Sequence, residues 1–130
     1  MKNLKKLLVF FFICLLILAV YQGQGLQNKN PKTVPISITV DEEGNIRCDR
    51  AEARRGNWVQ WDSEYTFAID FSKTTPFRKF KFQSRQNRVR AQVIFRGAEE
   101  TGTTWTFKYF VAVYYEGKVL TLDPDLDIRP

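Results

Sequence analysis

The chain has 130 residues, no histidine, and Met1 as its only methionine. These counts exclude imidazole metal sites and the catalytic motifs that depend on histidine. The net charge of +6 indicates a basic protein, but from Thr33 onward 15 basic residues face 14 acidic ones. That part is nearly neutral, so the overall basicity does not by itself support nucleic-acid binding.

The first 21 residues predict a signal peptide or an N-terminal membrane anchor. Three lysines precede an unbroken apolar run over residues 7–20, which is the layout of an export signal. A helix of about 15 residues spans roughly 22 Å, less than the roughly 30 Å hydrocarbon core, and this favours a cleaved signal. Bulky Tyr21 at the expected cleavage site favours retention. We therefore expect an exported, periplasmic or extracytoplasmic protein, free or anchored in the inner membrane by residues 4–21.

Residues 22–33 predict a flexible tether, and residues 34–130 predict one folded domain. The tether is rich in Gln, Asn and Gly and has no apolar period. The domain contains one cysteine, Cys48, so it has no internal disulfide and depends on hydrophobic burial. We expect Cys48 to be a partly buried thiol, with an intermolecular disulfide as the alternative.

Alternating apolar residues predict an all-β domain. The expected strands cover residues 36–40, 46–48, 58–62, 65–71, 104–116, 119–122 and 127–128. Residues 49–55 are the one segment in which a helical turn is expected. Seven or eight short strands at this spacing indicate an antiparallel Greek-key sandwich or a barrel.

A basic stretch over residues 77–98 holds seven cations and no acid. Strand alternation, with a hairpin turn near residues 84–87, sends Phe80, Phe82 and four further apolar residues inward. The same alternation gives an outer cationic face of Lys79, Lys81, Arg88, Arg90 and Arg96. This face is the candidate site for an anionic partner, and the alternative is a solvated surface that discourages edge-to-edge pairing. Nucleic acid is not expected, because the aromatic residues point away from the cations.

Catalytic candidates are few. Asp62 and Glu64 stand two residues apart and form the one carboxylate pair of interest, but they lie at an expected turn, where such residues are common. We therefore assign no catalytic residues, no metal and no cofactor, and expect a protein that is not an enzyme.

Three segments carry a resemblance to a known family: Arg55-Gly56-Asn57-Trp58-Val59-Gln60-Trp61-Asp62, residues 109–113 and residues 122–128. The first is similar to the tryptophan strand, and the other two are similar to the closing strands, of the cupredoxin-like β-sandwich family of small bacterial proteins. The resemblance implies the family's fold. It does not imply electron transfer, because copper members use a thiolate and imidazoles, and residues 66–130 contain no Cys, His or Met.

The sequence therefore predicts a non-catalytic binding or structural module of the cell envelope. Its expected partner is an anionic envelope component or an acidic protein surface, with membrane contact through the N-terminal segment if that segment is retained. The alternatives are a degenerate metal or redox protein that uses Cys48 between subunits, or a hydrolase built on Asp62 and Glu64. The oligomeric state is left open.

Overall fold

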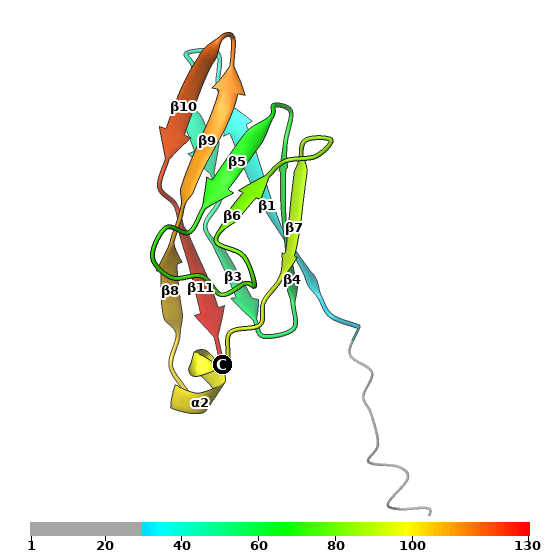
Figure 1. Cartoon of the computed structure of the whole chain (residues 1–130), viewed down its shortest axis with the longest axis vertical. Coiled ribbons are helices and arrows are strands. Elements are labelled where there is room, and N and C mark those ends of the chain that lie inside the picture. Colours follow the sequence, from blue (N-terminus) through cyan, green and yellow to red (C-terminus); the bar gives the residue numbers. More distant parts are fainter. Residues whose placement is uncertain (1–29) are drawn as a thin grey trace, which may run out of the picture. The chain divides into compact units, whose positions relative to one another are not determined.

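The computed structural model describes residues 30–130, so the expected signal or anchor and most of the tether lie outside the described residues. The strands are β1 (Thr33–Val40), β2 (Ile46–Cys48), β3 (Ala51–Arg54), β4 (Trp58–Ser63), β5 (Phe67–Asp70), β6 (Lys81–Gln83), β7 (Arg88–Gln92), β8 (Trp105–Lys108), β9 (Phe110–Tyr115), β10 (Lys118–Leu122) and β11 (Asp125–Arg129). The helix α2 covers Gly97–Thr101 (Figure 1). Within residues 30–130 no helix is long and apolar enough to cross a membrane.

The described strands form three sheets. The first has the order β2-β1-β4-β7, the second β10-β9-β5-β6, and the third β3-β11-β8. Buried side chains from all three sheets belong to one hydrophobic core. This all-β arrangement is compatible with a β-sandwich.

The expectation of purely antiparallel sheets was wrong. β1 pairs with β4 in parallel, and β3 pairs with β11 in parallel. After the antiparallel β1–β2 pair, the chain crosses to the third sheet as β3 before β4 returns beside β1. That crossing lets β4 run in the same direction as β1.

The alternation predicted from the sequence identifies most of the core. Every second residue is buried along β1, β4, β5 and β7. The largest fully buried side chains include Trp61, Tyr109, Phe67, Phe71, Ile36, Ile38 and Ile69. Cross-strand contacts on one face thus hold each strand in register.

Three elements differ from the expectation. The long strand expected over residues 104–116 is interrupted at Tyr109, because β8 pairs with β11 whereas β9 pairs with β5 and β10. Residues 49–55 contain the strand β3 rather than a helical turn, because Ala51 and Ala53 are buried against the third sheet. Helix α2 was not expected, since its five residues are too few to show a helical period.

Trp61 lies at the centre of the core. Its indole is fully buried and meets the rings of Phe71, Phe77, Phe82 and Tyr109 at centroid distances of 5.6–6.5 Å. Trp61 Nε1 donates a hydrogen bond of 3.2 Å to the Tyr109 hydroxyl. The polar atom of each ring therefore has a partner inside an apolar core.

Removing this hydroxyl tests its contribution. Tyr109→Phe leaves the indole N–H of Trp61 without an acceptor in the core, so we expect a loss of about 1–2 kcal/mol in the free energy of unfolding. Urea denaturation measures it. The matched control is Tyr114→Phe on an exposed tyrosine, which should change little. Equal stabilities for the two variants would contradict the role assigned to the bond.

Asp127 is the one buried charged residue among residues 30–130. Its carboxylate accepts hydrogen bonds from Arg50 Nε at 2.9 Å and from Thr106 Oγ1 at 2.7 Å. Burial raises the pKa of Asp127, but these hydrogen bonds and the Arg50 charge outweigh burial and hold the pKa below its usual value. The ionised carboxylate therefore ties β11 to β8 and to the segment before β3.

A pKa that is lowered in the folded state makes stability depend on pH. The contribution of Asp127 is present above its ordinary pKa of 3.8 and is lost as the pH falls through the lower folded value. We expect Asp127→Asn to destabilise the domain at pH 7 and the difference from wild type to shrink below about pH 4. Thermal melts from pH 7 to pH 2 test this, with exposed Asp123→Asn as the control.

Candidate functional site

The five predicted cations do not lie on one outer face, and that expectation was wrong. The hairpin turn is present: Arg85 and Arg88 exchange two backbone hydrogen bonds around a turn at Gln86 and Asn87. Beyond it, β6 joins the second sheet and β7 joins the first, and the two strands diverge (Figure 1). Side-chain alternation cannot place residues of two different sheets on one face.

Arg88 is engaged elsewhere. Its Nε donates a hydrogen bond of 2.6 Å to Asp62 Oδ1 on the neighbouring strand β4. Burial raises the pKa of Asp62, but hydrogen bonds from Gln60 and Arg88 outweigh burial and lower it. Arg88 therefore pairs with a carboxylate of its own sheet, and it does not line the hollows that the other four cations line.

The other four cations line three hollows beside β6, β7 and the segments next to them. These hollows adjoin through shared residues, and we call them together the basic groove. Its basic side chains are Arg55, Arg78, Lys79, Lys81, Arg85, Arg90 and Arg96, and its one acidic side chain is Glu99. Lys79, Lys81, Arg90 and Arg96, which the sequence placed together on one flat face, are distributed over these three hollows.

Two of these cations have acidic partners. Arg55 Nη1 lies 3.2 Å from Glu99 Oε2, and Lys81 Nζ lies 3.6 Å from Asp70 Oδ2. All four side chains are substantially exposed, so water screens both pairs. Among residues 30–130 the other five groove cations form no ion pair, and three of them, Arg78, Lys79 and Arg90, line the central hollow.

The central hollow has a volume of about 540 Å³ and combines charge with apolar surface. Arg78, Lys79 and Arg90 supply the charge, and no carboxylate lines this hollow. The guanidinium carbon of Arg90 lies 4.7 Å from the centroid of the Trp58 ring, within range of a cation–π contact. Arg90 Nη2 also donates a hydrogen bond of 3.3 Å to Thr33 Oγ1, so two contacts orient the guanidinium over the half-buried indole.

The floor of the central hollow is apolar. Phe77 is buried, Phe82 is half-buried, and Ile94 is 45 % exposed. The sequence also predicted Phe80 to be buried, which was wrong: Phe80 is 46 % exposed, because it precedes β6 and is not bound by that strand's alternation. Trp58 and Arg78 were not recognised as site residues, since the first was assigned only to a strand and the second only to the basic stretch.

Asp62 and Glu64, the carboxylate pair considered for catalysis, lie beside the same hollow. Ser37, Thr39 and Tyr65 also line it. Asp62, however, is held as an ionised carboxylate by Arg88 and Gln60, which suits a structural ion pair more than a proton-transferring group.

Cys48 is free and half-buried. Its Sγ lies 3.5 Å from the Tyr109 hydroxyl. Burial raises the pKa of the Cys48 thiol, and the hydrogen bond to Tyr109 offsets only part of that effect. Between residues 30 and 130 no group of three His, Cys, Asp or Glu side chains is arranged to hold a metal ion.

The raised pKa predicts a poorly reactive thiol, since the thiolate is the nucleophile. In a Cys14→Ser background at pH 8, we expect Cys48 to react with an aromatic disulfide reagent at least about tenfold more slowly in the folded than in the urea-unfolded protein. The release of coloured thiolate measures both rates. Equal rates in the folded and unfolded protein would show that the fold does not suppress the reactivity of Cys48.

Comparison of the chain with protein-family models finds no match, and comparison with curated proteins finds none either.

Proposed function

We propose that residues 34–130 form a cupredoxin-like β-sandwich without a copper site. We propose further that the protein is an exported or membrane-anchored, non-catalytic module of the cell envelope, and that this module binds an anionic partner through the basic groove. The N-terminal apolar run supports export. The tryptophan strand supports the scaffold, because β4 carries the fully buried Trp61 at the centre of the core.

One observation carries the binding proposal. The central hollow of the basic groove gathers Arg78, Lys79 and Arg90 around an aromatic and aliphatic floor, with no carboxylate in its lining. The whole domain from Thr33 onward has nearly balanced charge, so this local excess is a property of the groove. Guanidinium groups suit carboxylate and phosphate oxygens, and Arg90 is already oriented by Trp58.

A charge reversal tests the groove. The assay measures retention of the full chain, in non-ionic detergent, on an immobilised sulfated polysaccharide. We expect Lys79→Glu with Arg90→Glu to reduce this retention by about tenfold or more. At physiological salt exposed charges act only within about 8 Å, so only charges close to the bound anion contribute. Elution in a salt gradient measures retention.

The matched control is Arg47→Glu with Lys118→Glu, which changes the net charge equally. These residues lie on β2 and β10, the edge strands farthest from β7 and β6 in their sheets. Equal losses in both double variants would show that net charge alone binds the matrix and would refute the groove. Thermal melts of all variants exclude unfolding as the cause.

A further inference from the structure

The basic groove is bordered by two sheet edges that separate after a single bridge. Arg85 and Arg88 form the one paired position between the arms of the hairpin. From there β6 pairs only with β5, and β7 pairs only with β4. Both are the last strands of their sheets. Continued pairing of the arms would have closed the space that the groove occupies.

The β7 edge turns unpaired backbone groups toward the groove. Val93 N–H donates to Asn57 O, and Val93 O accepts from Gly56 N–H, so the backbone of Val93 points toward the β4 side. Because this direction alternates along a strand, the N–H and C=O groups of Arg90 and Gln92 point the other way.

The ends of this edge are occupied. Arg88 is paired with Arg85, and Ile94 N–H donates to Pro76 O. Between them, the groove-facing backbone groups of Arg90 and Gln92 have no strand partner among residues 30–130. The open window is therefore two residues of β7, with paired positions on either side.

The β6 edge has the same property. Ser84 N–H donates to Phe67 O, and Phe80 O accepts from Phe71 N–H, so alternate backbone groups of this arm point toward β5. The backbone groups of Lys81 and Gln83 consequently point away from β5. The groove thus combines open backbone groups on both strand edges with basic and apolar lining residues.

We propose that the partner is an extended acidic peptide segment of another protein, which adds as a strand to the β7 edge at Arg90 and Gln92. This inference rests on the proposed function and specifies its ligand. A segment about 4.8 Å from β7 would pair with the open window. Its alternate side chains would face the floor at Phe77 and Phe82, and the others would face the outer side of the sheet, which carries Arg90.

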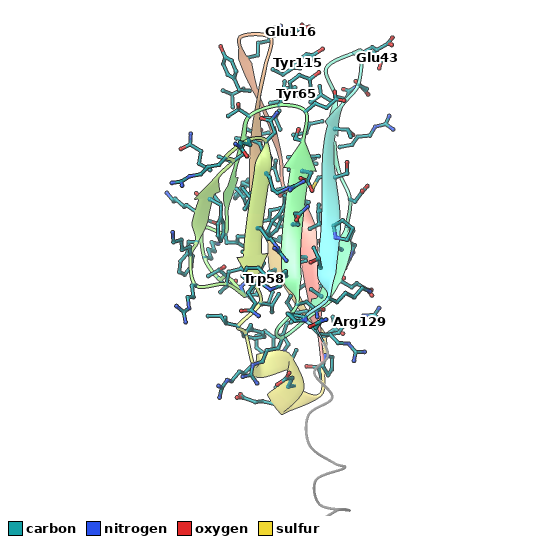
Figure 2. All side chains as sticks on the ribbon, turned by 90° about the vertical axis from the view of Figure 1, so that its right-hand side faces the viewer. Glu43, Trp58, Tyr65, Tyr115, Glu116 and Arg129 are labelled. Atoms are coloured by element: carbon teal, nitrogen blue, oxygen red, sulfur yellow. The ribbon has the colours of Figure 1, made fainter. Side chains whose placement is uncertain are left out.

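The lining of the groove therefore specifies a sequence pattern, in which acidic and apolar residues alternate. Charge complementarity identifies the occupant as acidic. The chain's own N-terminal segment does not fit, because no acidic residue precedes Asp41. The acidic turn that follows β1 lies at the opposite end of the domain from Trp58, as the labelled Glu43 shows (Figure 2).

The test uses a labelled, end-blocked hexapeptide, Asp-Val-Asp-Val-Asp-Val, and fluorescence anisotropy with the full chain in non-ionic detergent. A second peptide has the same composition in two blocks, and a third has esters in place of its backbone amides. We expect the block peptide and the ester peptide each to bind at least about tenfold more weakly than the alternating peptide. The block peptide loses the side-chain alternation, and the ester peptide loses the backbone N–H donors. Binding of the ester peptide within about twofold of the amide peptide would overturn strand addition.

A protein variant tests the same edge. Gln92→Pro removes the groove-facing N–H and leaves the β4 ladder intact, as proline on a sheet edge can. We expect about tenfold weaker binding of the alternating peptide, whereas Gln92→Ala, which removes only the side chain, should stay within about threefold of wild type. Equal effects of the two substitutions would overturn the proposal. If Gln92→Pro does not fold, the ester peptide with wild-type protein decides the question.

The two proposals fail separately. Retention on the sulfated polysaccharide that depends on Lys79 and Arg90, together with no preference for the alternating peptide, refutes strand addition and leaves the basic groove. Retention of wild type that does not depend on Lys79 and Arg90 refutes the proposed function itself. Self-association that Gln92→Pro abolishes, measured by light scattering, would identify a second copy as the occupant and overturn the acidic partner.

Discussion

The burial of Trp61 is the interaction on which the rest of the structure depends. This one side chain joins β4 of the first sheet to Phe82 on β6 and Tyr109 beside β9, and its N–H is satisfied by the Tyr109 hydroxyl. It also packs against Phe77, in the loop that precedes β6. Because Phe77 and Phe82 form the floor of the basic groove, the core and the candidate site share one aromatic cluster.

The basic groove exists because a hairpin opens. The turn at Gln86 and Asn87 uses two residues with positive φ, a conformation that non-glycine residues adopt rarely. The arms then follow different sheets, each drawn by its own apolar side chains: Phe82 packs on Trp61 from one side, and Val89 and Ala91 are buried from the other. Each arm buries its apolar side chains against a different sheet, so the arms do not continue to pair with each other. Both strands therefore end their sheets with an unpaired edge.

The charged residues divide according to their surroundings. Asp127 and Asp62 keep lowered pKa values because arginine and hydrogen-bond donors outweigh the effect of burial. Cys48 and Tyr109 have no such charge beside them, and burial raises the pKa values of both groups. Asp62 and Asp127 are thus held as ionised carboxylates and Cys48 as a protonated thiol, whereas Arg78, Lys79 and Arg90 line a hollow without a carboxylate.

The sequence by itself determined the all-β class, most of the buried residues and the acid-free stretch that supplies most of the groove's cations. Alternation with a period of two residues predicts which side of a strand is buried, and the acid-free stretch over residues 77–98 indicates a local excess of positive charge. Only the tertiary structure decided that β1 pairs in parallel with β4, that Arg88 is neutralised by Asp62, and that Trp58 lies under Arg90. Alternation within one strand carries no information about which sheet that strand joins. The division of β6 and β7 between two sheets, which shapes the groove, therefore depends on contacts with strands distant in the sequence.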